Sequence, residues 1–541
     1  MFKKLALGLA VVAVVGCSDS DLEPGSANPS ASISAVPADI AAVFNKPKYA
    51  NSIWGLRVLD ADTGEVLIDT QPSFEFFVAS VRKAFSVGLL LEMAGASRTY
   101  DTPVFRQGDV NNAGVLDGNL VLVASGDLTM GGRNGPDGKI EITEYDHNEA
   151  NGLGNAVLSS ADPLAGYKDL ARQVVDAGIT QITGEVVVDD RLFAPYFFRD
   201  EFFLTPAFVN DDVVDLVIEP TTVGNLASVG VRPLSSALTV VNSLLTSAPG
   251  SELDIDLNPE APAIGLPGAS AEIDGDLPID LVPPLTNTFP LIRNFRITNP
   301  SNYARTVFVE ALEAEGVQVN AATVEPNPVG VLPAPGSYAP SDQVALLVGS
   351  PVSEIARYVM KVSYNIGADT SLLLFGLTQG VDNMADALSR EQEFLSNEVG
   401  IDPEDYNFLD GSGGGETTAT TSAVTTLLDF LLDSGSGSTF LASMPILGVD
   451  GSLGFVTDFE SDPTLAGAAG KVYAKTGTFA GAENGSLVVK AQAFAGYIDA
   501  RSGRRLTYIV VVNEVPVNEV LDVIEIFQDE GTISAVLWRE Y

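Results

Sequence analysis

This 541-residue chain has very little cysteine and histidine: Cys17 and His147 are the only residues of either type. A single cysteine excludes an intrachain disulfide, and a single histidine excludes a zinc site built from several histidines. A Ser-His-Asp triad would have to use His147, which lies in a polar, loop-like run at 144–149, whereas triads stand on firm supports. If the chain is a serine hydrolase, we therefore expect its base to be a lysine.

Basic residues are also scarce, with 29 Lys and Arg against 71 Asp and Glu, so the formal net charge is -42. Such a surface repels phosphates, which argues against a nucleic-acid partner. It suits a secreted protein in salty water, where screening relieves the self-repulsion, and simple solubility is reason enough for it. Because 46% of the residues are hydrophobic and 18% charged, the chain should fold, and its length predicts two to four domains.

The N-terminal apolar run, at 5–15, is too short to span a bilayer as a mature helix. It follows Lys3 and Lys4, and Val-Val-Gly-Cys at 14–17 resembles a bacterial lipoprotein cleavage box. The resemblance implies a signal peptide at 1–16, a lipid on Cys17 and a periplasmic location. Ser18, in place of Asp, implies the outer membrane under enteric-type sorting.

An ordinary signal peptide with an incidental cysteine is the alternative to a lipoprotein signal. In either case residues 17–38, which are polar and rich in Pro, Ser and Ala, predict a flexible tether.

The first motif with chemical meaning is Ser80-Val-Arg-Lys83, in an apolar run that predicts a helix to about residue 94. Residues i and i+3 share a helix face, so the Ser80 hydroxyl and the Lys83 amine can meet. A lysine in a protected pocket can act as a base, and a serine beside it becomes a nucleophile. By itself, however, the pair is expected about once by chance, as a helix start with an exposed lysine.

Two further motifs follow along the chain. Ser363-Tyr-Asn365 lies between a helix predicted at 352–364 and another that starts at about 368. Lys475-Thr476-Gly477-Thr478 follows a strand predicted at 471–474, which places it at the strand end. A Lys-Thr-Gly triplet is expected fewer than about 0.1 times by chance in this length, so the third motif carries the most information.

The remaining pattern predicts an α/β (α+β) fold. Strands are predicted at 53–60, 65–69, 119–123, 184–188, 488–498 and 506–512, and helices at 164–177, 299–315, 421–432 and from 518 to 527 or farther. Residues 97–296 contain strand-like runs between Gly, Pro and Asp-rich loops, which indicates a mostly β insertion of one or two subdomains.

The three motifs in this order resemble the active-site set of penicillin-binding proteins and serine β-lactamases. The long separation of Lys83 from Ser363 is similar to that in the low-molecular-mass class C D-alanyl-D-alanine carboxypeptidase/endopeptidase family. Other stretches match the pattern of that family, at 124–129, 178–184, 410–413 and 444–453. The resemblance implies a catalytic domain with a central sheet flanked by helices, made from 39–96 and 297–541 and split by the insertion at 97–296.

The resemblance also implies a role for each motif residue. Ser80 would attack the terminal D-Ala-D-Ala bond of a peptidoglycan stem peptide, and Lys83 would accept the proton of Ser80. Asn365 would orient Lys83 and the substrate amide. Ser363 would relay a proton to the leaving amine, with Lys475 keeping that network electropositive.

The family's third motif is implied to bind the substrate, with Thr476, Gly477 and Thr478 at the substrate carboxylate. The oxyanion hole would use the backbone N–H groups of Ser80 and Thr478. β-Lactams would acylate Ser80 and inhibit the enzyme, and neither a metal nor an organic cofactor is needed.

Two other functions fit the same sequence: an esterase or another D-amino-acid peptidase with this machinery, and a non-catalytic wall-binding lipoprotein, against which the intact motifs argue. The chain departs from the family pattern where Gly414 and Gly415 replace the usual Leu-Ser. It also has a bulky Tyr364, which we expect to narrow the cleft or change substrate choice.

Overall fold

The computed structural model describes residues 36–199, 201–483, 486–518 and 520–541. These residues form two compact units, of which unit 1 contains residues up to 92, 359–368 and 388–541, and unit 2 contains 93–358 and 369–387. The predicted signal peptide, Cys17 and nearly all of the predicted tether lie outside the described residues. The predicted domain boundaries remain a prediction.

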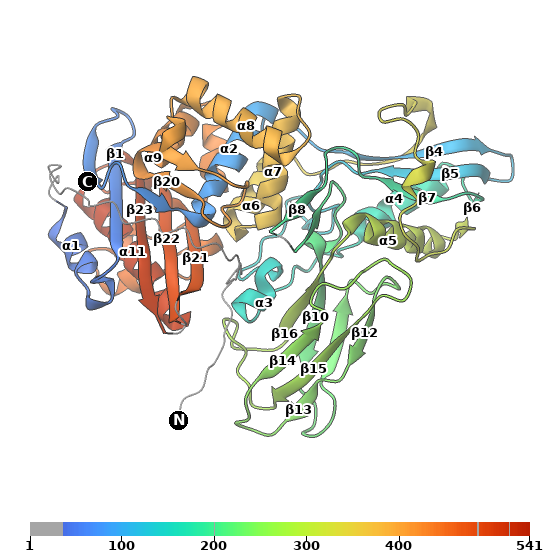
Figure 1. Cartoon of the computed structure of the whole chain (residues 1–541), viewed down its shortest axis with the longest axis horizontal. Helices are drawn as coiled ribbons and strands as arrows, with labels where there is room; N and C mark the ends of the chain where they lie inside the picture. The colour runs from blue at the N-terminus through green and yellow to red at the C-terminus, as the bar shows by residue number, and fades with distance from the viewer. Residues whose placement is uncertain (1–35, 200, 484–485, 519) are drawn as a thin grey trace. The chain divides into compact units, whose positions relative to one another are not determined.

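Unit 1 is built on a five-stranded sheet (Figure 1). In spatial order its strands are β2 (Val66–Thr70), β1 (Ile53–Asp60), β23 (Arg505–Val517), β22 (Ser486–Asp499) and β21 (Val472–Glu483). All neighbouring strands in the sheet are antiparallel. The predicted hairpin at 53–60 and 65–69 is therefore confirmed as β1 and β2.

Helices cover both faces of this sheet. Two adjacent residues of β23 contact different helices. The Thr507 hydroxyl donates to Asp429 on α9 (Thr421–Asp433). The Tyr508 hydroxyl lies 3.0 Å from that of Ser534 on α11 (Val520–Glu540). Successive side chains of a strand point to opposite faces, so α9 and α11 lie on opposite sides. A strand buried on both faces is a continuous apolar run, which explains the sequence from Leu506 to Val512.

Unit 1 has further elements beside this sheet and its two covering helices. Unit 1 also contains α1 (Ala38–Phe44), β3 (Glu75–Phe77), the short 3₁₀ helix η2 (Ala79–Arg82), α2 (Lys83–Ala94), β19 (Tyr406–Asn407), β20 (Thr418–Thr420) and α10 (Gly437–Ser443). The end of α2 belongs to unit 2, and three further helices have residues in both units: α6 (Val352–Val362), α7 (Asn365–Thr378) and α8 (Met384–Phe394). The start of α7, at Asn365, is three residues earlier than predicted.

Unit 2 is mostly β, with several sheets (Figure 1). Its six-stranded sheet contains β4 (Thr102–Val110), β5 (Val115–Val123), β6 (Gln181–Ile182), β7 (Val186–Asp189), β17 (Gln318–Val319) and β18 (Gln343–Leu347). Smaller sheets are formed by β8 (Tyr196–Phe198) with β9 (Phe202–Leu204), by β10 (Val213–Glu219), β11 (Ser228–Arg232) and β16 (Leu291–Arg296), and by β12 (Thr239–Asn242), β13 (Leu245–Ser247), β14 (Asp254–Asn258) and β15 (Ser270–Pro278). Its helices are α3 (Ala150–Leu153), α4 (Ala165–Asp176) and α5 (Pro300–Ala314), so the helices predicted at 164–177 and 299–315 are confirmed.

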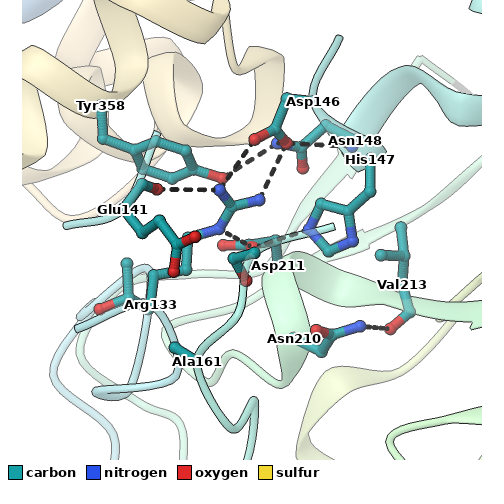
Figure 2. A network of polar contacts seen from close by, with 12 residues as sticks. Arg133, Glu141, Asp146, His147, Asn148, Ala161, Asn210, Asp211, Val213 and Tyr358 are labelled. Atoms are coloured by element: carbon teal, nitrogen blue, oxygen red, sulfur yellow. Dashed lines mark hydrogen bonds and ion pairs between the residues drawn. The ribbon is translucent and has the colours of Figure 1, made fainter. Parts of the chain in front are cut away.

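A buried network of charged side chains lies inside unit 2 (Figure 2). The Arg133 guanidinium donates to Asp146 at 2.8 and 2.9 Å and to Asp211 at 2.5 Å. The ring of His147 lies between two carboxylates, with Nε2 2.9 Å from Asp211 and Nδ1 2.8 Å from Asp215. Buried charges need such partners because desolvation is costly, so the network gives the insertion an ordered polar core.

Within the part of the chain that the structure describes, no helix is both long and apolar enough to cross a membrane. The same residues contain no cluster of three or more His, Cys, Asp or Glu side chains arranged to hold a metal ion.

Candidate active site

The predicted nucleophile lies on a tight turn between a strand and a helix. β3 ends at Phe77, η2 carries Ser80, and α2 begins at Lys83. Ala79, just before the serine, has a left-handed φ of 45°, a conformation that costs energy for a residue with a Cβ. Lys83 Nζ donates to Ser80 Oγ at 2.6 Å, and Lys83 is fully buried. The structure thus brings the two residues of the first motif together.

Lys83 is held by two further acceptors from distant parts of the sequence. Its Nζ donates to Asn365 Oδ1, at the start of α7, at 2.7 Å and to the Ser412 carbonyl oxygen at 2.9 Å. Three acceptors around one amine leave little freedom for the lysine side chain. The second motif therefore contributes Asn365 to the same centre as Ser80.

The glycine-rich loop at 410–415 keeps its contact with this centre although it departs from the family pattern. The Asp410 carboxylate accepts hydrogen bonds from the N–H groups of Ser412 at 2.9 Å and Gly413 at 2.6 Å. Gly413 has φ +94°, and a Cβ there would lie 2.1 Å from the Ala79 carbonyl oxygen. Only glycine fits so close to the nucleophile turn.

The expectation that Tyr364 narrows the cleft or changes substrate choice stays a prediction. Its side chain is 1% exposed, so it packs inside the protein.

A buried ion pair supports the nucleophile turn from behind. Arg82 donates to the Glu391 carboxylate at 2.8 and 2.5 Å, and its Nε donates to the Asp410 carbonyl oxygen at 2.9 Å. The charge of the Arg82 guanidinium is therefore compensated by the Glu391 carboxylate. Glu391 carries no recognisable motif, so sequence reasoning missed it.

Ser363 and Lys475 form the second half of the constellation. Lys475 Nζ donates to Ser363 Oγ at 2.9 Å and to the Thr476 carbonyl oxygen at 2.7 Å. Burial, together with the nearby charge of Lys83, lowers the pKa of Lys475 well below its usual range. Ser363 itself has a left-handed φ of 62°, which is backbone strain of the kind found at functional sites. Two close amines repel when both are charged, which favours a neutral amine in the pair.

The third motif lies inside a strand, and not at a strand end as predicted, because β21 continues from Val472 to Glu483. Gly477 lies within the strand, where the absence of a side chain permits a close approach to the nucleophile turn. A Cβ at Gly477 would lie 2.3 Å from the Val78 carbonyl oxygen and 3.3 Å from the Ser80 backbone nitrogen. Gly477 therefore lets β21 pass alongside the nucleophile turn.

Both threonines of the motif have hydrogen-bond partners within unit 1. The Thr476 hydroxyl lies 2.7 Å from that of Ser452, and the Thr478 hydroxyl donates to Gln492 Oε1 at 2.8 Å. Ser452 lies in the stretch at 444–453 that matched the family pattern. Gln492 was not singled out, although it pairs with Thr478 across β21 and β22.

His147 is unsuited to act as the base of a serine hydrolase, because carboxylates occupy both of its ring nitrogens. The Ser80 hydroxyl instead contacts a lysine. This arrangement agrees with the inference drawn from the scarcity of histidine.

Comparisons with known proteins extend over nearly the whole chain. Residues 36–527 match the D-Ala-D-Ala carboxypeptidase 3 (S13) family. A D-alanyl-D-alanine carboxypeptidase of Actinomadura sp. (strain R39) is 25% identical over 508 residues, which cover 88% of this chain and 80% of that protein.

Solved structures show the same fold. Penicillin binding protein 4 of Haemophilus influenzae has a TM-score of 0.67 at 17% identity, covering 92% of this chain and 99% of that one. A complex of that protein with a novel β-lactam has a TM-score of 0.65 at 17% identity, covering 93% and 99% of the two chains. The family match spans far more than half of the sequence and includes all three motifs, and we conclude that this chain belongs to the D-Ala-D-Ala carboxypeptidase 3 (S13) family of serine-type penicillin-binding proteins.

Proposed function

We propose that this enzyme cleaves the terminal D-Ala-D-Ala bond of peptidoglycan stem peptides through an acyl-enzyme on Ser80. The observation that carries the assignment is the 2.6 Å contact between Lys83 Nζ and Ser80 Oγ, with Lys83 buried and held from another side by Asn365. In its neutral form a lysine at that distance accepts the hydroxyl hydrogen. Ser80 Oγ can then form a bond to the carbonyl carbon of the penultimate residue.

The leaving D-alanine needs a proton as its C–N bond breaks. Ser363 donates its hydroxyl hydrogen to the leaving amine. The proton that Lys83 took from Ser80 replaces the one lost by Ser363, so the number of protons in the centre is unchanged. Lys475, 2.9 Å from Ser363 Oγ, keeps this side of the centre electropositive. Water afterwards attacks the acyl carbon, releases the shortened peptide and regenerates Ser80.

Two backbone donors would stabilise the oxyanion, namely the N–H groups of Ser80 and Thr478. The passage of Gly477 against the nucleophile turn supports this pairing, because it brings β21 alongside Ser80. The hydroxyls of Thr476 and Thr478 would bind the terminal carboxylate. A β-lactam carries a matching amide and carboxylate, so it would acylate Ser80 and stall at that stage.

Covalent labelling tests the assignment of the nucleophile. A fluorescent penicillin should label the wild-type protein, and Ser80→Ala should show no label while keeping the wild-type melting temperature. Ser86→Ala, which removes a buried hydroxyl bonded to the Gly411 carbonyl oxygen, is the matched control and should still be labelled. Labelling of Ser80→Ala would exclude Ser80 as the nucleophile, and no label on any protein would favour a non-catalytic wall-binding protein.

Substrate class is tested with a D-Ala-D-Ala peptide, a cross-linked dimer of stem peptides and a simple ester. Release of terminal D-alanine supports carboxypeptidase activity, and cleavage of the dimer supports endopeptidase activity. Faster turnover of the ester than of either peptide would instead support the esterase alternative.

For location, we propose a periplasmic protein anchored in the outer membrane through a lipid on Cys17. Support comes from the cleavage-box pattern at 14–17 and from Ser18. The variant Cys17→Ser should move the protein from the membrane fraction to the soluble fraction in a cell fractionation. Unchanged membrane association would refute the lipid anchor.

A further inference from the structure

The Thr478 hydroxyl is backed by two polar side chains inside unit 1. Gln492, on β22, lies directly opposite Thr478 in the strand register, with the Thr478 hydroxyl 2.8 Å from its Oε1. Gln492 Nε2 lies 3.4 Å from Oε2 of Glu530, on α11. Gln492 and Glu530 are both fully buried. A threonine proposed to bind substrate is thus connected to a carboxyl group in the core.

The direction of these hydrogen bonds matters for binding an anion. A hydroxyl has one hydrogen, and a Thr478 that donates it to Gln492 presents only lone pairs to a carboxylate. In this orientation of the amide, Oε1 of Glu530 has no hydrogen-bond partner among the described residues, although a buried polar atom normally has one.

A half-turn of the Gln492 amide, which exchanges its oxygen and nitrogen, frees the hydroxyl hydrogen of Thr478 if Glu530 is protonated. The carboxylic acid of Glu530 then donates to the Gln492 oxygen, and the Gln492 nitrogen donates to Thr478 Oγ1. The hydroxyl hydrogen of Thr478 is left for a ligand. Each of the two Gln492 contacts then joins a donor to an acceptor, and Glu530 Oε1 lacks a partner among the described residues in either orientation of the amide.

The surroundings of Glu530 favour its protonated form. Burial raises the pKa of Glu530 well above its usual range, and the negative charge of Asp529 adds to the effect. Nearby cations do not compensate, since Lys46 and Lys48 pair with Asp529 instead. The other titratable groups that interact with Glu530 are the phenols of Tyr49 and Tyr508, which are neutral near pH 7 and leave the acid form favoured.

We propose that Gln492 and Glu530 are positioning residues that direct the Thr478 hydroxyl hydrogen toward the terminal carboxylate of the substrate. The inference rests on the proposed function, in which Thr478 binds that carboxylate. Glu530 acts only through Gln492 and touches no reacting atom. The same arrangement would serve the carboxylate of a β-lactam.

Steady-state kinetics on two matched substrates test the proposal. One is a peptide ending in D-Ala-D-Ala, and the other is the same peptide with its C-terminal carboxylate replaced by an amide. A hydrogen bond to a charged group is worth a factor of roughly 10 to 100. Glu530→Met and Gln492→Met should raise KM for the carboxylate substrate by about tenfold, with kcat nearly unchanged, and should leave kinetics on the amide unchanged.

Glu530→Gln provides a rescue, because its amide nitrogen can donate to Gln492 as the protonated acid does. Its KM for the carboxylate substrate should lie within about threefold of wild type, well below the tenfold change of a lost charged hydrogen bond. A melting-temperature measurement for each variant identifies any that does not fold. If Glu530→Met does not fold, the comparison of Glu530→Gln with Gln492→Met tests the proposal.

Thr478→Val separates the two levels of the argument. If it raises KM for the carboxylate substrate but Glu530→Met and Gln492→Met do not, the positioning role is wrong and the carboxylate assignment stands. If Thr478→Val leaves KM unchanged, the carboxylate assignment fails, and the positioning role fails with it. Equal losses on both substrates would show that Gln492 and Glu530 only maintain the fold.

Discussion

At the scale of single residues, the candidate centre depends on the protonation of two buried lysines. Lys83 contacts the nucleophile, and Lys475 contacts Ser363. Both are fully buried, and desolvation disfavours the charged form of an amine. Lysine can respond by losing a proton, whereas arginine stays charged at any accessible pH. We therefore expect that activity requires a lysine at residue 83 and not only a positive charge.

Lys83→Arg should reduce the rate of acylation by fluorescent penicillin about 10³-fold, the size of a lost general base. Lys471→Arg, at an exposed position just before β21, is the control and should acylate at the wild-type rate. An arginine variant that labels as quickly as wild type would exclude residue 83 as the base.

Glu391→Gln tests the buried ion pair beneath the nucleophile turn. Removing one partner leaves the Arg82 charge buried and uncompensated, which should lower the free energy of unfolding by about 3–5 kcal/mol. On the same helix Arg390 and Glu393 form a pair with 45% and 59% exposed side chains, and Glu393→Gln should change stability by less than about 1 kcal/mol. Chemical denaturation of both variants makes the comparison, and similar losses would contradict a special role for the Arg82 pair.

At the scale of elements, the position of β21 relative to the nucleophile turn decides the geometry of the site. The strand passes so close that Gly477 has no room for a side chain. Catalytic geometry is sensitive to displacements of about 1 Å, which can cost on the order of 100-fold in rate. We therefore expect the spacing between β21 and η2 to control activity more than it controls folding.

Gly477→Ala should slow acylation about 100-fold while the protein stays folded. Gly481, on the same strand, has open space where a Cβ would lie, so Gly481→Ala should acylate normally. Circular dichroism and the rate of penicillin labelling distinguish the two variants. A labelling rate near wild type for Gly477→Ala would mean that the strand can shift at no cost to the chemistry.

At the scale of the whole molecule, the two units have different charged and polar groups in their interiors. Unit 2 holds its own network around His147, in which both ring nitrogens face carboxylates. A neutral imidazole can donate from only one nitrogen, so two carboxylates favour the charged ring. Burial alone would lower the pKa of His147, but Asp215 and Asp211 outweigh it and raise the pKa to about 9.

Because the folded pKa of His147 lies above the unfolded value of 6.5, its contribution to stability is fully present below pH 6.5 and is lost as the pH rises through about 9. The contribution is about 3 kcal/mol. Thermal unfolding of wild type and His147→Gln between pH 6 and 10 should show a stability difference that shrinks with rising pH. A difference that stays constant or grows would contradict a charged His147.

Much of the site was predictable because its residues come in short, rare combinations. Ser80 and Lys83 lie one helical turn apart. The Lys-Thr-Gly triplet at 475–477 is one that chance seldom produces. The long apolar strands β22 and β23 were predictable for a similar reason, since burial on both faces removes nearly all polar residues from the run. Local pattern was enough wherever the relevant neighbours are close in sequence.

Other features depend on contacts between residues far apart in the chain. The length of β21 was underestimated because glycine is depleted in strands, whereas here Gly477 permits contact with the nucleophile turn. Glu391, Gln492 and Glu530 carry no motif, and only folding brings them to Arg82 and Thr478. The start of α7 was displaced because the left-handed turn at Ser363 cannot be inferred from composition.

The sequence by itself determined the chemical class of this protein. Its single histidine and single cysteine, together with three spaced motifs, predicted a serine nucleophile with a lysine base. The tertiary structure decided which groups orient that chemistry: the Asn365 and Ser412 acceptors around Lys83, the carboxylate that neutralises Arg82 and the buried groups behind Thr478. The physical reason is that reactivity follows from the residue types present, whereas hydrogen-bond direction, desolvation and charge pairing depend on neighbours that only folding brings together.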